Sequence, residues 1–181
     1  MERVGRGVER RLPTGPHGIP ADVVARNQRE RLIAAMAEVC AERGYAHASV
    51  AGVAKRAGVS SVTFYKQFAD KRDCMLATHR QLLGRLLEAV DAAGSPLPTL
   101  LSLLAADPPS TRLLTVEILA AGPEGAKRQD AMVKALAERL GVDWVRAAGI
   151  VALIGKCVMA GEADRLPELE NEVLTSLSSQ G

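Results

Sequence analysis

Three of the five aromatic residues in this 181-residue chain fall within five positions, at Phe64, Tyr65 and Phe68. They lie in the stretch GVSSVTFYKQFADK (58–71), which indicates a very short helix opened by Ser60. Because a helix this short does not hold together by intrinsic propensity, large side chains must pin it to its neighbours. We therefore expect Phe64 and Phe68 to point inward and Tyr65 to lie on the opposite face.

A tight turn at 58–60 joins this short helix to the one before it. Ser49 is placed to cap the preceding helix, and Gly58 occupies the position where a left-handed residue ends it. Two short helices joined by such a turn form a helix-turn-helix, which lays its second helix in the major groove of DNA. The residues around the turn are basic: Lys55, Arg56, Lys66, Lys71 and Arg72.

Helical periodicity continues on both sides of this motif, and no strand pattern or internal repeat is present. Leu, Ala, Glu and Arg are abundant, which favours helix over sheet. We therefore predict an all-α fold of about nine helices, in which an N-terminal three-helix helix-turn-helix domain is fused to a C-terminal helical bundle. Capping residues and glycine or proline breaks predict helices at about 22–43, 49–57, 60–68, 70–93, 97–106, 107–121, 123–140 and 143–160, and from Pro167 onward.

Charge is distributed unevenly along the chain. Residues 1–73 hold 13 Lys/Arg and 8 Asp/Glu, whereas residues 74–181 hold 10 and 13. This asymmetry predicts a basic N-terminal part that meets a polyanion and a mildly acidic part with another task. We expect a flexible basic arm over 1–21, a DNA-binding domain over 22–72, and a ligand-binding and dimerisation domain over 73–181.

The bulk composition excludes several classes of protein. A chain that is 48% hydrophobic and 24% charged is typical of a soluble globular protein. The longest apolar run, 147–155, is too short to cross a bilayer, and the N-terminus lacks the apolar segment of a signal peptide. Cys40, Cys74 and Cys157 are far apart, which predicts no disulfide framework. We expect a cytoplasmic protein that does not associate with membranes.

No residues are spaced for catalysis, for a cofactor or for a metal. The sequence has no nucleophile elbow and no glycine-rich phosphate loop after a strand. His17, His47 and His79 share no metal-like spacing, and His79 falls in an apolar stripe. We expect His79 to be a core or pocket histidine with satisfied hydrogen bonds, and the protein to be neither an enzyme nor a cofactor carrier.

Residues 28–76 resemble the DNA-binding region of tetracycline-repressor (TetR) family transcriptional regulators. The match is strongest in AGVSSVTFYKQFADK, where the family commonly shows Gly-Val-Ser, then Thr-apolar-Tyr, then Phe and Lys. The resemblance implies a homodimer that binds a palindromic operator in double-stranded DNA. It also implies that the last two helices form a four-helix bundle with those of the partner. The residues expected near this contact are Trp144, Gly149, Leu153 and Leu174.

The resemblance also implies roles at the DNA. Tyr65 and Lys71 are expected to contact phosphates, and Thr63 a base or a phosphate. The alternative for Lys71 is a solvated surface lysine. The chain departs from the family at Ser61 and Val62, where relatives often carry Arg or Lys, so the reading face is nearly neutral. The predicted DNA-binding residues are Ser49, Lys55, Ser60, Ser61, Val62, Thr63, Tyr65, Lys66, Gln67 and Lys71, assisted by Arg3, Arg6, Arg10 and Arg11 in the arm.

The C-terminal part is expected to bind an effector. Trp144 is its single aromatic residue, so a cavity between its helices would be aliphatic and suited to a small apolar ligand. Arg112 and Glu117 are candidates for its polar groups, with an exposed helical pair as the alternative. The predicted ligand-binding residues are Leu83, Leu87, Leu104, Leu113 and Glu117.

Three functional hypotheses follow from the sequence. The leading one is a homodimeric transcriptional repressor that a small apolar ligand releases from DNA. The second is a helical interaction protein of the same fold that has lost specific operator binding, which the neutral pair Ser61 and Val62 would explain. The third, an enzyme built on a helical bundle, lacks a candidate catalytic group.

Overall fold

The computed structural model describes residues 20–170 and residue 173, and this part of the chain forms helices and no strands. The predicted all-α fold is therefore confirmed. None of the described helices combines the length and the apolar character needed to cross a membrane. In chain order the elements are α1 (Ala21–Arg43), the 3₁₀ helix η1 (Tyr45–His47), α2 (Val50–Ala57), α3 (Ser61–Gln67), α4 (Lys71–Asp91), α5 (Pro96–Ala106), α6 (Pro108–Thr115), the 3₁₀ helix η2 (Glu117–Ala121), α7 (Pro123–Leu140), α8 (Trp144–Met159) and the 3₁₀ helix η3 (Ala163–Leu169).

Side-chain caps set most helix starts where the sequence places them. The side chains of Ser49, Ser60, Asp70 and Asp143 each accept a hydrogen bond from the backbone N–H three residues further on. The carboxylate of Asp73 also accepts a hydrogen bond from the backbone N–H of Ala69, one residue before the Asp70 cap, so the contact is similar to a capping box but displaced by one residue. These bonds join residues close in sequence, so they do not depend on tertiary contacts.

Two segments differ from the predicted helices. The sixth helix ends at Thr115, and the chain continues as η2 (Glu117–Ala121), because Val116 leaves helical geometry and turns Glu117 inward. A Cβ on Gly125 of α7 would lie 2.0 Å from the carbonyl oxygen of Ile118, so α7 approaches the backbone of η2 more closely than any other residue allows. The segment around Pro167 is 3₁₀ rather than a regular helix.

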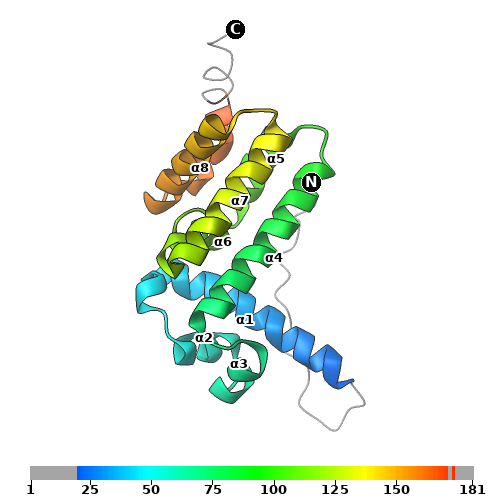
Figure 1. Cartoon of the computed structure of the whole chain (residues 1–181), viewed down its shortest axis with the longest axis vertical. Helices are drawn as coiled ribbons and strands as arrows, with labels where there is room; N and C mark the ends of the chain where they lie inside the picture. Colours follow the sequence, from blue (N-terminus) through cyan, green and yellow to red (C-terminus); the bar gives the residue numbers. More distant parts are fainter. Residues whose placement is uncertain (1–19, 171–172, 174–181) are drawn as a thin grey trace.

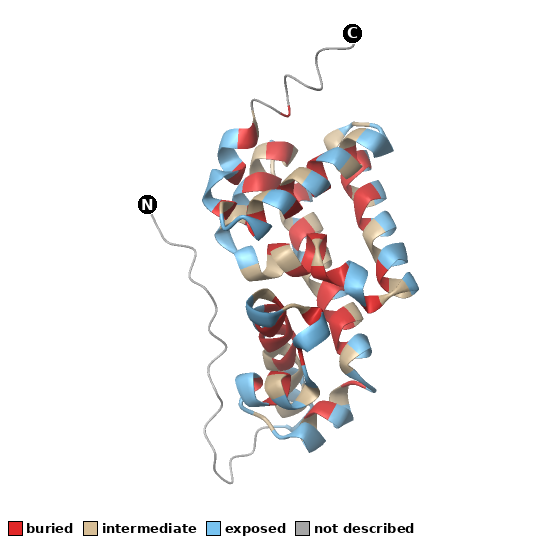
Figure 2. Ribbon diagram, turned by 90° about the vertical axis from the view of Figure 1, so that its left-hand side faces the viewer, coloured by how far each residue is buried: buried red, intermediate tan, exposed pale blue. Residues whose placement is uncertain are grey.

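The helices form two ends of one molecule, with α4 running between them (Figure 1). Helices α1, α2 and α3 lie at one end and α5, α7 and α8 at the other. Figure 2 shows that buried positions follow the inward faces of the helices in both halves. Because α4 begins three residues after Phe68, no linker separates the helix-turn-helix from the rest of the chain.

The buried residues form two clusters that do not coincide with the expected domains. The first cluster joins α1, α2 and α3 to Cys74 and Met75 of α4, and it also takes in Leu113, Ile118 and Ala121 from the C-terminal part. The second cluster is built from α5, α7, α8 and the far half of α4. The expected boundary at residue 73 therefore does not separate two cores.

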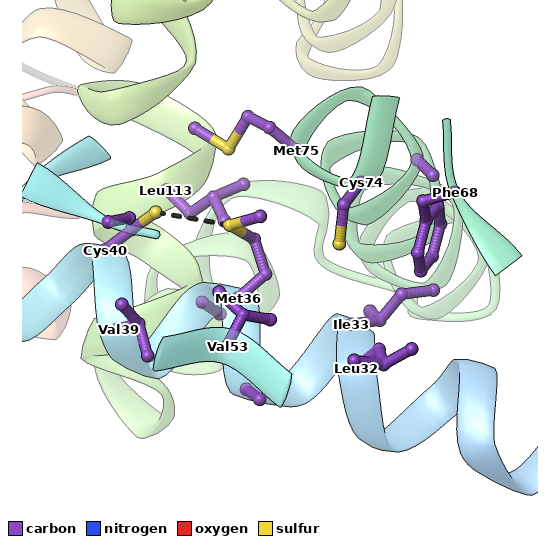
Figure 3. Close-up of a cluster of buried hydrophobic side chains, with 14 of the residues drawn as sticks. Leu32, Ile33, Met36, Val39, Cys40, Val53, Phe68, Cys74, Met75 and Leu113 are labelled. Carbon is purple, nitrogen blue, oxygen red and sulfur yellow. Dashed lines mark hydrogen bonds between the residues drawn. The ribbon is translucent and has the colours of Figure 1, made fainter. Parts of the chain in front are cut away.

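Figure 3 shows the first cluster between α1 and α4. The thiol of Cys40 lies 3.6 Å from the sulfur of Met36, and Cys74 is buried beside Phe68. Burial raises the pKa of both thiols to about 12, so they stay protonated at neutral pH. Both cysteines act as packing residues in this core.

Candidate functional site

The short helix α3 is held by its two phenylalanines, as its sequence predicts. Phe64 and Phe68 are 0% and 2% exposed, and their ring centroids lie 5.6 Å apart. The guanidinium of Arg29 lies 4.3 Å from the centre of the Phe68 ring and donates a hydrogen bond to the carbonyl of Gln67. Aromatic burial and one arginine therefore fasten the middle and the C-terminal end of α3 to the core and to α1.

The opposite face of α3 is open to solvent. Val62 is 67% exposed and Tyr65 59% exposed, and Ser61 and Lys66 are exposed beside them. We call these four residues the reading face. Ser49 and Lys55 of α2 are also exposed. The exposed face of α3 thus combines polar, apolar and aromatic side chains, and Lys66 is its one cation.

Three of the predicted DNA-binding residues also form hydrogen bonds within the helix-turn-helix. The hydroxyl groups of Ser60 and Thr63 lie 3.0 Å apart, and Ser60 caps α3. The amide of Gln67 donates to the carbonyl of Ala25 in α1 at 3.3 Å. Gln67 thus ties α3 to α1, and Ser60 and Thr63 stabilise the start of α3. The contacts of all three with DNA stay predictions.

The C-terminal end of α2 has a partner that sequence reasoning missed. Arg31 of α1 donates to the carbonyl groups of Ala57 and Gly58, where Gly58 takes a left-handed φ of +64°. These bonds satisfy carbonyl groups that the end of a helix leaves free. The sequence pattern indicates only that Arg31 is a polar residue on the outer face of α1, and it gives no sign of the bonds to Ala57 and Gly58.

Ion pairing removes one of the predicted cations from the basic surface. Arg56 donates to Glu38 at 2.8 Å and to Glu42 at 2.6 Å, so its charge is balanced by α1. In contrast, Lys55, Lys66 and Arg72 are exposed and form no ion pair with any residue in the described part of the chain. These three cations are available to an anionic partner.

Lys71 is neither solvated nor free. Its ammonium donates to the carbonyl groups of Tyr45 and Ala48, both at 2.9 Å, and lies 4.3 Å from the centre of the Tyr45 ring. The alternative of a solvated surface lysine is therefore wrong. Lys71 ties the first turn of α4 to η1, immediately before the Ser49 cap of α2.

A buried ion pair joins the two ends of the molecule. Glu117 is 8% exposed, and its Oε2 accepts a hydrogen bond from the backbone N–H of Tyr45 at 2.7 Å. Arg112 donates to Glu117 Oε1 at 2.9 Å and to the carbonyl of Ala41 at 3.0 Å. We call these contacts of Arg112 and Glu117 with Ala41 and Tyr45 the clamp. The expected exposed helical pair is thus wrong, because both side chains turn toward α1 and η1.

The five predicted ligand-binding residues do not lie in one core. Leu113 belongs to the first cluster, whereas Leu104 belongs to the second, which Leu83 and Leu87 flank. A hollow of about 590 Å³ lies elsewhere, between α1, α4 and the α5–α6 junction. None of the five predicted ligand-binding residues lines this hollow. The charged residues that line it are Glu30, Arg31, Glu38, Arg56, Arg85 and Asp107.

His79 is a buried histidine whose hydrogen bonds are not satisfied. It is 1% exposed, and neither ring nitrogen has a hydrogen-bond partner in the described part of the chain. Burial lowers the pKa of His79 to about 4, and the charge of Arg128 adds to this effect. The imidazole is therefore neutral at pH 7, and the expectation of a satisfied core histidine is wrong.

Comparison with known proteins places the helix-turn-helix in a family. Residues 32–78 match the family described as "Bacterial regulatory proteins, tetR family". This region of the chain is therefore of the TetR type. The match takes in the second half of α1, η1, α2, α3 and the first part of α4, so it includes the helix that carries the reading face.

Two curated relatives match about a third of the chain. A fatty acid metabolism regulator protein of Bacillus subtilis is 34% identical over 61 residues, and the HTH-type transcriptional regulator BetI of Stenotrophomonas maltophilia is 44% identical over 63 residues. The matches cover 34% and 35% of this chain, and the chain spans about a third of each relative, 31% and 32%.

The likeness of the fold extends over most of the chain. The crystal structure of the transcriptional regulator FadR from Bacillus subtilis in complex with stearoyl-CoA superposes with a TM-score of 0.64 at 23% identity. The match covers 83% of this chain and 97% of that one. The C-terminal bundle therefore has the fold of TetR-family regulators, although its sequence has diverged.

We predict that Lys71 and Lys66 make different contributions to stability. Lys71→Met removes two charge-assisted hydrogen bonds and should lower the free energy of unfolding by about 2–3 kcal/mol. Lys66→Met removes an exposed charge and should change the free energy of unfolding by less than about 0.5 kcal/mol. Urea unfolding followed by circular dichroism measures both, and equal effects would contradict the contacts of Lys71 with Tyr45 and Ala48.

We also predict acid sensitivity from His79. The unfolded chain binds a proton at this residue near pH 6.5, whereas the folded chain resists it until about pH 4. Stability should therefore be full above pH 6.5 and fall by up to about 3 kcal/mol as the pH drops to 4. Urea unfolding at pH 7, 5.5 and 4 should show a shallower loss in His79→Leu, whereas His47→Leu, at an exposed histidine, should keep the slope of the unaltered protein.

Proposed function

We propose that the protein is a homodimeric transcriptional repressor that binds a palindromic operator and is released from it by a small apolar ligand. The observation that carries this proposal is the reading face, which Phe64 and Phe68 hold outward on a helix fixed to α1. A recognition helix must be rigid and open on one side to enter the major groove. The match of residues 32–78 to the TetR family supports the same function.

Within the reading face, we assign different roles to different side chains. Tyr65 and Lys66 are exposed and carry groups that bind phosphate, which positions the protein without selecting a sequence. Val62 offers an apolar surface to a thymine methyl group, and Ser61 can bond to a base edge. We place the main phosphate contact at Lys66 rather than Lys71, because Lys71 already binds two carbonyl groups.

Helix α8 supplies the surface that we propose for dimerisation. Trp144, Val145 and Met159 are 48%, 71% and 52% exposed, and Gly149 is exposed between them. Such apolar exposure on one helix is typical of a surface that a partner covers. Gly155 packs against Thr115 and Val116 of the same chain instead. Leu153 flanks the second cluster, and Leu174 lies outside the described residues.

Two features support coupling between ligand and DNA. Helix α4 continues from the helix-turn-helix into the second cluster, and the clamp ties η2 to η1. A ligand that shifts α4 or η2 therefore changes the placement of α2 and α3, and with it the separation of the two reading faces. The aliphatic second cluster suits an apolar ligand, and the structurally similar FadR was crystallised with stearoyl-CoA.

We predict distinct effects of substitutions on DNA binding. Tyr65→Phe should weaken binding to all sequences by about five- to tenfold, since it removes one phosphate hydrogen bond. Lys66→Met should also make the slope of log affinity against log salt less negative by about 0.9. Val62→Ala should change the preference at one base position. Selection from random DNA followed by anisotropy titrations in a salt series measures all three.

Lys134→Met is the matched control, because Lys134 is exposed on α7 at a distance in sequence from the reading face. It should leave affinity and salt slope unchanged. If selection enriches no sequence although the protein is folded and dimeric, the repressor assignment fails. The alternative, an interaction protein of the same fold, would then hold.

We predict that Gly149→Leu weakens the dimer. A side chain at Gly149 meets no atom of its own chain within 4 Å, so the change should disturb only a surface that a partner covers. Gly84→Leu is the matched control on α4, where the space is equally open. Sedimentation at micromolar concentration should show monomers for Gly149→Leu and dimers for Gly84→Leu. A monomeric unaltered protein would contradict the dimer itself.

A further inference from the structure

A group of polar side chains lies where the two apolar clusters meet. Along α4, Met75 belongs to the first cluster and Leu86 to the second, and His79 lies between them. Helices α6 and α7 and the 3₁₀ helix η2 bring further polar groups to this part of the fold, and α4 packs against all three. We call this group the polar layer: its buried members are Thr78, His79, Thr111, Thr115 and Glu117, and the half-buried Gln129 contributes a buried Oε1 atom.

Most of the polar layer is satisfied from within the chain. Thr78, Thr111 and Thr115 donate to the carbonyl groups of residues 74, 104 and 111 at 2.7–2.8 Å. Three buried side-chain atoms have no hydrogen-bond partner among residues 20–170 and 173: both ring nitrogens of His79 and Oε1 of Gln129. Buried polar atoms are rarely left unpaired, because their desolvation is not repaid.

These three atoms belong to one region of the fold. Gln129 occupies the face of α7 that carries Met132 and Val133, which are buried in the second cluster. Its amide nitrogen donates to the carbonyl of Thr115 at 3.1 Å, which fixes Oε1 as the free end. Arg128, the preceding residue, is close enough to His79 for its charge to lower the pKa of the imidazole.

The free atoms define the chemistry of a binding partner. A neutral imidazole has one N–H donor and one acceptor nitrogen, and Gln129 Oε1 is an acceptor. A hydroxyl or primary amide meets this demand, since it accepts from the imidazole and donates to the amide oxygen. The buried residues of the second cluster beside this site are aliphatic, and the neighbouring cation, Arg128, is paired with Glu124 at 3.5 Å. A charged head would therefore have to lose its hydration in this buried layer.

We propose that His79 and Gln129 anchor the polar head of the effector, which is an uncharged, mainly aliphatic molecule that both donates and accepts hydrogen bonds. A medium-chain alcohol or amide has this chemistry. This inference rests on the proposed function only in calling the bound molecule an effector. The unpaired atoms of His79 and Gln129 are present whether or not the protein regulates transcription. Glu117, which the sequence places at the ligand, belongs to the clamp instead.

The test compares 1-octanol with its isomer methyl heptyl ether, which lacks the donor. Both are titrated into the full-length protein labelled with ¹⁵N, and the ring nitrogens of the three histidines are followed by NMR. We expect octanol to shift the His79 signals in a saturable way and the ether to bind about tenfold more weakly. Octanamide should behave like octanol, and octanoate should bind more weakly than either.

Gln129→Leu should reduce the preference for octanol over the ether to within about twofold, because it removes the acceptor that only octanol can use. His79→Phe removes a donor that both ligands can use, so it should weaken both by a similar factor. His47→Phe, at an exposed histidine, is the matched control and should keep the full preference. Equal binding of alcohol and ether to the unaltered protein would overturn the anchor. Unchanged His79 signals at the solubility limit of octanol would also overturn the anchor. That result would indicate that buried water alone forms hydrogen bonds with His79 and Gln129.

A second titration separates this inference from the proposed function. DNA obtained by selection is titrated with the protein in the presence and absence of saturating octanol. Octanol that shifts His79 but leaves the affinity for DNA unchanged supports the anchor and contradicts ligand-driven release. If octanol weakens DNA binding to the same extent in the unaltered protein and in Gln129→Leu, the anchor is overturned. Ligand-driven release would still be supported in that case.

Discussion

The backbone of Tyr45 is held from two sides by charged side chains. Its N–H donates to Glu117 at 2.7 Å, and its carbonyl accepts from Lys71 at 2.9 Å. Both bonds are charge-assisted, and the one to Glu117 is shielded from water, which makes each stronger than an exposed bond between neutral groups. The residue thus joins the end of α1, the start of α4 and the η2 segment at one point. The Ser49 cap of α2 follows four residues later, so the helix-turn-helix is placed relative to this joint.

The joint explains why the two cores do not separate at the domain boundary. Glu117 reaches Tyr45 only because α6 ends at Thr115 and η2 turns inward, and this turn carries Ile118 into the first cluster. The bonds that cross from α6 and η2 to α1 and η1 are those of Glu117 with the N–H of Tyr45 and of Arg112 with the carbonyl of Ala41. They are hydrogen bonds to charged groups, so they tie η2 to the segment that precedes the helix-turn-helix. This property suits a regulator whose two ends must respond to each other.

The polar layer has a different physical character from the joint. In the clamp, Arg112 and Tyr45 satisfy the buried carboxylate of Glu117, so it stabilises a single arrangement. At His79, no residue in the described part of the chain supplies the missing hydrogen bonds, so the native state carries a cost that a suitable ligand can offset. The clamp at η2 and the unpaired His79 on α4 thus belong to two elements that pack against each other. Their placement on adjoining elements is the basis of the coupling that we propose between ligand binding and the position of the reading face.

The sequence alone determined the helices, the turn and the inward phenylalanines, because these depend on caps, glycine and periodicity within a few residues. Ser60, Gly58 and Phe64 behave as their local pattern predicts. Only the tertiary structure decided the roles of Lys71, Glu117 and His79. Their partners lie 26 and 72 residues away for Lys71 and Glu117, and for His79 the decisive fact is a missing partner. Hydrogen bonds between distant segments produce no periodic pattern in a single sequence. Only the tertiary structure therefore identifies them.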